Sequence, residues 1–448
     1  MVIQHPSARQ GSSPTSTAVS GGTNLKHGRA SRYRYISIVT SLLIAVMAVM
    51  AFSPFFHGNL VSSSAVVHEI APVMMTPSLI RQAMIPLSSP EGDDTSLMTV
   101  RGDEYDDWFM QGEGRDRHKE GTLRHVFKTR IEKQKKFCSK MGDELPRIVP
   151  VNVSSNGNAS VAVLERIDSI WSMDGFEQYS LYALQSFNEN GMADIVSHSL
   201  HEYGQWEGGE IQSIIYKLDA FAESQGLSRS EVYFVDIGAN VGTFSFAIAM
   251  MGFQVLAFEA LQVNQEALRM SLCANPQLIE SIAIFNTALG KDKATCQMFS
   301  DPQNILDGAV ACGPSKKPPF AFLVWRQQLD IVRLDDVLDR TTMANLTGKV
   351  GAVKMDTEGF EPWVIQGGRR FFNTTKPRYF VTELNPPPLK AATNTSSLDF
   401  IRQIQSFGYS LRNGSFDSPV LSKRTIRRAF SRKNEHLTNL YFTMEETL

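Results

Sequence analysis

A buried strand that ends in a glycine-rich turn is the feature that most narrows the folds open to this chain. The apolar run that begins at Val232 leads into VDIGANVGTFS at 235–245, and a helical pattern follows over 243–251. Gly238 and Gly242 allow the backbone to turn sharply and to approach a ligand without a clash at Cβ. The helix then presents free N–H groups beside the turn. Strand, turn and helix together predict a cofactor site at the carboxyl end of the strand.

Further apolar runs alternate with helical patterns along the C-terminal half of the chain. The other buried-strand candidates are 255–258, 282–285, 352–355, 379–382 and 440–443. Apolar residues recur at helical spacing over 211–221, 262–274 and 361–371. This alternation predicts an α/β fold, in which helices cover both faces of a mostly parallel sheet. Ligands bind such sheets at the carboxyl ends of the strands.

An acidic residue ends the second predicted strand. Glu259 follows the run 255–258, where its carboxylate can accept hydrogen bonds from both hydroxyls of a ribose. The turn before it reads G-A-N-V-G, which differs from the G-x-G-x-x-G of dinucleotide enzymes. Asp236 in the first strand differs from that fingerprint as well. The turn and the two acids therefore indicate a nucleoside cofactor other than NAD.

A second group of acids follows another buried strand. The segment VKMDTEGFE at 353–361 places Asp356, Glu358 and Glu361 within a few residues of one another. Crowded carboxylates repel unless a proton, a metal or hydrogen-bond donors compensate, and the crowding raises the pKa of one of them, as suits a general base. Glu383 ends the run 379–382 and points to the same sheet edge. In the structural alternative, Asp356 caps a helix and Glu361 is a first-turn acid.

At these residues the sequence resembles the FkbM-type methyltransferase family. The shared motifs are VDIGANVGTFS at 235–245, AFEA at 257–260, RLDDVL at 333–338, VKMDTEGFEPWVIQGG at 353–368 and VTEL at 381–384. The resemblance covers about residues 195–412, with HEYGQWE at 201–207 as its lead-in. It implies a Rossmann-like class I methyltransferase fold with a seven-stranded sheet. It also implies S-adenosylmethionine as the methyl donor and, usually, a hydroxyl as the acceptor.

The resemblance assigns the donor site to particular residues. The implied set is Asp236, Gly238, Ala239, Asn240, Gly242, Glu259, Asn286 and Ala288. Of these, the residues of the strand and turn contact the methionine part of the donor and Glu259 contacts the ribose. Asn286 or Ala288 borders the adenine.

A base must remove the proton of the accepting hydroxyl. We rank Asp356 first, Glu358 second and His201 third for this role. Whether a metal joins the acids is left open, although their hard oxygen ligands would suit magnesium or calcium.

Two features depart from relatives in the family. Ala260 stands where many members carry proline. A longer segment, 301–328, separates the third strand from Asp335, and its Pro, Gly and Cys content predicts a loop.

An apolar segment near the N-terminus predicts a membrane anchor. Residues 36–56 carry no charge and, at about 20 residues, are just long enough for a helix that spans a bilayer. Lys26, Arg29, Arg32 and Arg34 precede the segment, and no Lys or Arg follows before Arg81. The positive-inside rule therefore puts the N-terminus in the cytosol and the rest of the chain in a lumen. A cleaved signal peptide and an organelle-targeting leader are the alternatives.

We expect five parts along the chain. They are a disordered cytosolic tail, an anchor helix, a stem or spacer, an FkbM-like methyltransferase domain and a C-terminal extension that completes the sheet. Their bounds are 1–35, 36–56, 57–192, 193–415 and 416–448. Within the stem, an acidic stretch at 91–107 precedes a basic stretch at 124–140 that is expected to be helical.

Glycosylation sequons and cysteines agree with a luminal location. Sequons occur after the apolar segment at Asn152, Asn158, Asn345, Asn373, Asn394 and Asn413. Such sequons matter only in a secretory lumen. The chain has 4 cysteines without metal-binding spacing. Cys296 and Cys312 flank the predicted loop and are the pair that the sequence favours for a disulfide.

The sequence thus predicts a single-pass type II membrane protein of the Golgi or endoplasmic reticulum that methylates a hydroxyl of a glycan or small molecule. A net charge of −2 gives no reason to expect nucleic acid as a partner. The alternatives are an NAD-type oxidoreductase, a luminal glycosyltransferase with the same anchor-and-stem layout, and a binding module that has lost catalysis. Against a glycosyltransferase, the catalytic half offers only the adjacent Asp335 and Asp336, which are expected to begin a helix.

Overall fold

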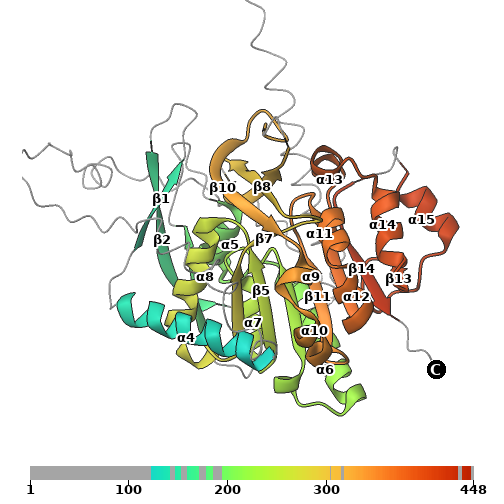
Figure 1. Ribbon diagram of the computed structural model, residues 1–448, viewed down its shortest axis with the longest axis horizontal. Coiled ribbons are helices and arrows are strands. Elements are labelled where there is room, and N and C mark those ends of the chain that lie inside the picture. Colours follow the sequence, from blue (N-terminus) through green and yellow to red (C-terminus); the bar gives the residue numbers. More distant parts are fainter. Residues whose placement is uncertain are drawn as a thin grey trace, which may run out of the picture. The chain divides into compact units, whose positions relative to one another are not determined.

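The computed structural model describes residues 123–141, 147–152, 159–170, 178–184, 194–302, 304–313, 317–431 and 436–444. These residues belong to one compact unit, Tyr105–Leu448 (Figure 1). The predicted tail, anchor and acidic stretch lie outside the described residues. None of the helices that are described has the length and apolar character needed to span a membrane.

A seven-stranded sheet forms the centre of this unit. Its order is β13-β14-β12-β11-β4-β5-β6. The strands are β4 Tyr233–Ile237, β5 Gln254–Glu259, β6 Ile282–Asn286, β11 Val350–Met355, β12 Tyr379–Leu384, β13 Tyr409–Arg412 and β14 Thr438–Met444. The five strands β12, β11, β4, β5 and β6 are parallel, whereas β14 runs antiparallel to both β12 and β13. The sequence prediction of a mostly parallel sheet is confirmed, although β13 was not among the predicted strands.

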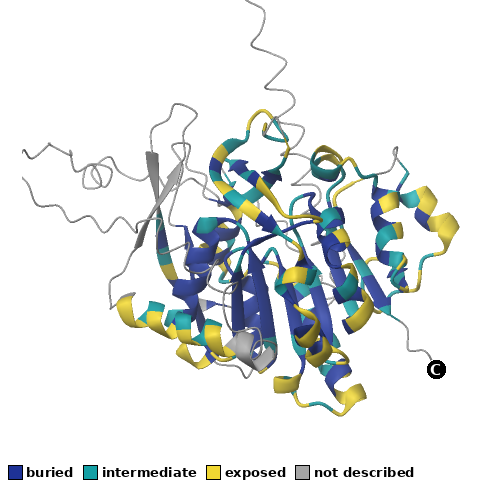
Figure 2. Cartoon of the chain, in the orientation of Figure 1, coloured by how far each residue is buried: buried dark blue, intermediate teal, exposed yellow. Residues whose placement is uncertain are grey.

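Helices cover both faces because the strands are apolar on both faces. Neighbouring residues of one strand, such as Phe234 and Val235, are fully buried and belong to two different core clusters. On one face pack α6 Gly208–Gln225, α7 Thr243–Met250 and α8 Gln262–Ala274. On the other pack α9 Leu334–Val337, α10 Arg340–Leu346, α11 Glu361–Gly367, α12 Arg369–Thr375, α14 Ser397–Gln405 and α15 Lys423–Ala429. Figure 2 shows the sheet as the most continuously buried part of the chain.

The helix predicted over 361–371 is interrupted. Here α11 ends at Gly367 and α12 begins at Arg369. Gly367 lies directly against another segment, since a Cβ built on it would stand 1.9 Å from the backbone oxygen of Gly290. This close approach leaves no room for a side chain, which explains the glycine at position 367. The apolar spacing typical of a helix continues past it, so the spacing alone did not reveal the break.

A second sheet of four strands replaces the loop predicted over 301–328. Its order is β7-β10-β8-β9, from β7 Ala288–Leu289, β8 Ala294–Asp301, β9 Asn304–Ala311 and β10 Val324–Val332. The loop prediction is wrong because β9 and much of β10 lie inside this segment, where β9 pairs antiparallel with β8. The predicted Cys296–Cys312 disulfide is confirmed, and it links β8 to the residue that follows β9.

The N-terminal part of the described chain packs on the domain that contains the seven-stranded sheet. It comprises α4 Leu123–Met141, followed by a three-stranded antiparallel sheet of β1 Arg147–Asn152, β2 Ala159–Ile170 and β3 Tyr179–Leu184. Arg130 donates to the backbone oxygen of Ile284 at 2.8 Å, and Gln134 donates to that of Arg269 at 2.9 Å. The basic stretch is helical as expected. Within the region expected to be a stem or spacer, these elements bury apolar and polar groups against α8 and β6.

The remaining elements connect the two sheets to the helices. They are α5 Ile195–Tyr203, α13 Pro386–Thr393 and two short 3-10 turns, Arg229–Glu231 and Pro276–Leu278. A further disulfide, Cys138–Cys273, joins α4 to α8 across a sequence separation of 135 residues. A crosslink over such a long loop restricts the unfolded chain strongly.

Removing the long-range disulfide should loosen α4. We expect the double variant Cys138→Ala, Cys273→Ala to lose about 2–4 kcal/mol of unfolding free energy and to be cleaved faster by trypsin within α4. Thermal unfolding and a timed digest under non-oxidising conditions measure both effects. The matched control is Cys296→Ala, Cys312→Ala, which should leave cleavage in α4 unchanged. Equal cleavage of α4 in both variants would contradict the tether.

Candidate active site

The glycine-rich turn follows β4 and lies directly on the neighbouring strand end. Gly238 has φ 82° and Gly242 has φ 96°, both in the left-handed region that favours glycine. A Cβ on Gly238 would stand 1.7 Å from the backbone oxygen of Asp356. The N–H groups of Gly238 and Ala239 donate to the backbone oxygen of Phe258 at 2.9 and 3.0 Å. The turn is therefore fixed between the ends of β11 and β5.

Glu259 ends β5 with a buried carboxylate that faces the turn. It accepts N–H groups from Asn240 at 2.8 Å, Ala260 at 2.9 Å and Leu261 at 2.7 Å. Burial raises the pKa of Glu259 to about 7, while these backbone donors act in the opposite direction. Each carboxylate oxygen can accept more than one hydrogen bond. Glu259 can therefore hold the turn and still accept ribose hydroxyls.

A pocket opens over the turn, at the carboxyl ends of β4, β5 and β11. Most of the predicted site residues line it: Gly238, Ala239, Asn240, Glu259, Ala288, Asp356 and Glu358. The sequence therefore located the site and most of its walls. Apolar side chains from β8 and β9 and the polar Asn264 from α8 also line it.

Three predicted donor-site residues lie behind the pocket wall. Asp236 is 0% exposed and accepts the hydroxyl of Ser245 at 2.6 Å, so it supports α7 beneath the turn. Gly242 is the residue at which α7 begins and faces the side chain of Phe246. Asn286 ends β6 outside the lining, and the next residues, Thr287 and Ala288, reach the pocket in its place.

The third candidate base, His201, lies away from the pocket. It is exposed on α5, whose contribution to the lining is Val196. Five residues separate the two, which at 3.6 residues per turn puts them well apart around the helix. His201 therefore does not reach the donor turn.

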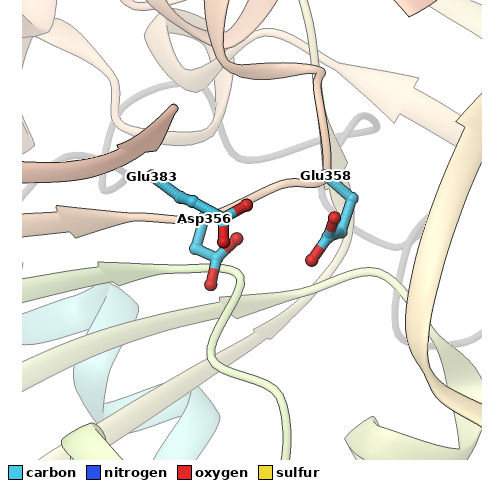
Figure 3. A group of neighbouring side chains, drawn as sticks. All are labelled: Asp356, Glu358 and Glu383. Carbon is cyan, nitrogen blue, oxygen red and sulfur yellow. The ribbon is translucent and has the colours of Figure 1, made fainter. Parts of the chain in front are cut away.

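Three carboxylates converge at the ends of β11 and β12. Oxygens of Asp356, Glu358 and Glu383 lie within 4.8 Å of one another. Figure 3 shows the three side chains at the strand ends. One oxygen each of Asp356 and Glu383 is buried without a hydrogen-bond partner. The spacing of these oxygen ligands is close enough for one divalent cation to bridge them. Glu383 belongs to this group, as the sequence suggested.

Glu361 serves the turn instead. Its carboxylate is buried and accepts the N–H groups of Thr357 at 2.7 Å and Gly359 at 3.2 Å. These bonds hold the backbone between β11 and α11, so that Glu358 adopts φ 53° and turns into the pocket. Glu361 does stand in the first turn of α11, as in the structural alternative, but its carboxylate is buried and bonded to the turn.

Desolvation and mutual repulsion keep protons on part of this acidic group. Burial, then the nearby Asp307 and Asp356, raises the pKa of Glu358 well above its usual range. Burial, then Asp356 and Glu361, raises the pKa of Glu383 to about 9. The crowding predicted from the sequence is thus present, and it raises the pKa of more than one acid. Lys354 opposes it as a cation, with its Nζ 3.3 Å from the Asp356 carboxylate.

Sequence reasoning missed three charged residues of the pocket: Glu207, Asp307 and Lys354. Lys354 donates to the backbone oxygen of Gly238 at 3.2 Å and so connects the turn to Asp356. Lys354 could have been found from the sequence, because a lysine is unusual inside an apolar strand such as Val350–Met355. Nothing in the sequence indicated Asp307, because it stands in the segment that was expected to be a loop.

Neutralising Glu383 should stabilise the fold near neutral pH. The folded chain holds a proton on Glu383 up to about pH 9, whereas an unfolded glutamate releases it near 4.5. Stability should therefore fall as the pH rises between these values. We expect Glu383→Gln to add on the order of 1 kcal/mol of unfolding free energy at about pH 8 and little at about pH 5. Thermal unfolding at both pH values measures this, with the exposed Glu223→Gln as control; an equal gain at both would contradict it.

Comparison with known proteins gives a family for this site. Residues 236–411 match the sequence model of the Methyltransferase FkbM domain. No curated protein matches the chain. The match begins in β4 and ends in β13, so it takes in both strand ends that carry the acids.

Several solved structures are similar at low identity. The bifunctional kinase-methyltransferase WbdD matches at 12% identity and TM-score 0.30, over 55% of this chain and 41% of that one. Magnesium protoporphyrin IX methyltransferase (ChlM) from Synechocystis PCC 6803 with bound SAM matches at 10% identity and TM-score 0.28, over 57% and 86%. Precorrin-6y C5,15-methyltransferase from Geobacter metallireducens GS-15 matches at 10% identity and TM-score 0.28, over 55% and 95%.

These structural similarities are too weak to bear on the substrate. The turn, Glu259 and the acidic motif that follows β11 all lie within the residues that match the family model. Over residues 236–411 the chain is therefore similar to the Methyltransferase FkbM domain, and the cofactor of such a domain is S-adenosylmethionine.

Proposed function

We propose that this protein transfers a methyl group from S-adenosylmethionine to a hydroxyl of a glycan or small molecule. The observation that carries the proposal is the contact between Gly238 in the donor turn and the backbone of Asp356. Because the two touch, a donor bound on the turn has its reactive end beside the carboxylates of the sheet edge. Donor site and base therefore share one pocket.

The chain's own residues would orient the donor at three points. The turn at Gly238–Asn240 takes the methionine part, and the carboxylate of Glu259 accepts the ribose hydroxyls. Ala288 and its neighbour Thr287 border the adenine. Holding the donor and acceptor in line can supply on the order of 7 kcal/mol of the barrier in good cases.

Asp356 is the base that fits this arrangement best. It follows β11 at the pocket wall and carries a buried oxygen without a hydrogen-bond partner. As the acceptor oxygen forms its bond to the methyl carbon, the methyl–sulfur bond breaks and the hydroxyl proton passes to Asp356. Glu358, which faces the same space from the next turn, is the second candidate.

The alternative functions find less support. Asp335 is committed to structure, since its carboxylate accepts the N–H groups of Arg370 and Phe371, both at 2.9 Å. Asp336 pairs with Arg333 at 2.6 Å. These acids stand in the first turn of α9 and do not line the pocket, as a nucleotide-sugar site would require. The form of the turn argues against NAD.

We further propose that the domain works in the lumen of the Golgi or endoplasmic reticulum, held by the apolar segment 36–56 as a type II anchor. Two observations support this location. All 4 cysteines are paired in two disulfides, and disulfides are usual in proteins of an oxidising compartment. The sequon asparagines of the domain, Asn345, Asn373, Asn394 and Asn413, are all exposed.

Two substitutions should separate chemistry from donor binding. Asp356→Ala should abolish turnover and leave donor affinity within about threefold, because the base acts on the acceptor. Glu259→Ala should weaken donor affinity by roughly tenfold or more, because it removes a charged hydrogen-bond acceptor. Calorimetry with S-adenosylmethionine measures affinity, and tritiated-methyl transfer into fractionated membrane lysate measures turnover. Normal turnover in the first variant or normal affinity in the second would refute the assignment.

The luminal location makes a separate prediction. When the full chain is expressed in secretory cells, digestion with an N-glycosidase should increase its gel mobility. Changing Asn345, Asn373, Asn394 or Asn413 to Gln, one at a time, should remove part of that shift wherever the site is used. A chain whose mobility does not respond to the enzyme would count against the lumen.

A further inference from the structure

Glu207 occupies a strained position at the start of α6. Its φ of 52° and ψ of 33° lie in the left-handed region, which non-glycine residues rarely adopt. Its backbone oxygen accepts the N–H groups of Glu210 at 2.9 Å and Ile211 at 3.1 Å, so the residue begins the helix. Its side chain makes no capping hydrogen bond. Backbone strain of this kind is common at functional positions.

The Glu207 side chain faces the donor pocket. It lines the same space as Gly238, Asn240 and Lys354, although the residue as a whole is exposed on its outer side. Its position is fixed from behind, because Glu210 in the next turn of α6 accepts the hydroxyl of Tyr441 from β14. The start of α6, and with it Glu207, is therefore anchored to the sheet.

The other acids around the pocket already have partners. Glu259 accepts three backbone N–H groups, and Asp356 pairs with Lys354. Asp307 accepts the amide of Asn304 at 3.1 Å and is hydrogen-bonded to Glu358. The Glu207 carboxylate accepts no hydrogen bond from the described residues, and Lys354, the cation that acts on it, is shared with Asp236 and Asp356. A cationic ligand group would give Glu207 a hydrogen-bonded partner of its own.

We infer that Glu207 binds the α-ammonium group of the methionine part of S-adenosylmethionine, an inference that rests on the proposed function. The methionine part is expected on the turn, and its ammonium group needs an anionic acceptor there. Asp236 is enclosed beneath the turn and bonded to Ser245, so it cannot reach a ligand directly. Glu207 supplies the acceptor from the opposite wall.

The test compares two nucleosides that differ in the amino-acid part. S-adenosylhomocysteine carries the ammonium group, whereas 5′-methylthioadenosine has a methyl group in place of the whole amino-acid chain. Calorimetry on the full chain should show that Glu207→Gln weakens S-adenosylhomocysteine by roughly 10- to 100-fold, as expected for a hydrogen bond to a charged group. Affinity for 5′-methylthioadenosine should stay within about twofold. Glu202→Gln, on the exposed part of α5, should change neither.

A second variant separates binding from folding. Glycine tolerates the left-handed conformation, so Glu207→Gly should melt no lower than the wild-type chain and yet lose the same affinity for S-adenosylhomocysteine. Unchanged affinity for S-adenosylhomocysteine, or an equal loss for both nucleosides, would overturn the inference while the donor site stands. A wild-type chain that binds neither nucleoside would instead overturn the proposed function and this inference with it.

Discussion

The parallel pairing of β4 with β11 is the interaction on which the site depends. Ile237 lies opposite Met355 at the ends of the two strands, and the N–H of Asp356 donates to the backbone oxygen of Ile237 at 2.9 Å. This register puts the first residue after β4 against the first residue after β11. A side chain on Gly238 would occupy the position of the Asp356 carbonyl. The backbone alone therefore joins the donor turn to the acidic group.

The same edge gathers charge that the protein interior disfavours. Asp307, Asp356, Glu358 and Glu383 stand together, and burial raises the pKa of several of them. Lys354 offsets part of the repulsion, and bound protons offset more. Such a group persists because two large apolar clusters enclose the sheet behind it. The stability of the core thus sustains an arrangement of acids that would not form on its own.

Much of the domain could be predicted because its signals are local. Five of the six predicted strand runs lie within observed parallel or antiparallel strands of apolar residues, and the 262–274 helix matches α8 in both bounds. Gly238, Glu259 and Asp356 could be assigned to the pocket from their places at strand ends. The sixth run, at Val232, begins just before β4, an offset of the kind that strand ends commonly show.

What could not be predicted depends on contacts between distant parts of the sequence. The partner of Cys138 is 135 residues away, and nothing in the spacing of the cysteines indicates it. Asp307 reaches the acids only because β9 folds back on β8. The role of Glu361 changed because its carboxylate finds two N–H groups in its own turn, which a count of nearby acids does not reveal.

The pocket is lined on one side by the ends of the seven-stranded sheet and on another by the four-stranded sheet. This division suggests which residues determine acceptor specificity. The turn after β4 and the end of β5 provide the donor side, which any substrate of the enzyme would meet unchanged. The second sheet provides Met298, Leu306 and Val310 on the other side, together with Asp307 at the acidic group. A disulfide fixes β8 to the end of β9 there. Because β9 of this sheet brings Leu306, Asp307 and Val310 to the pocket, differences in acceptor are expected to arise from its side chains.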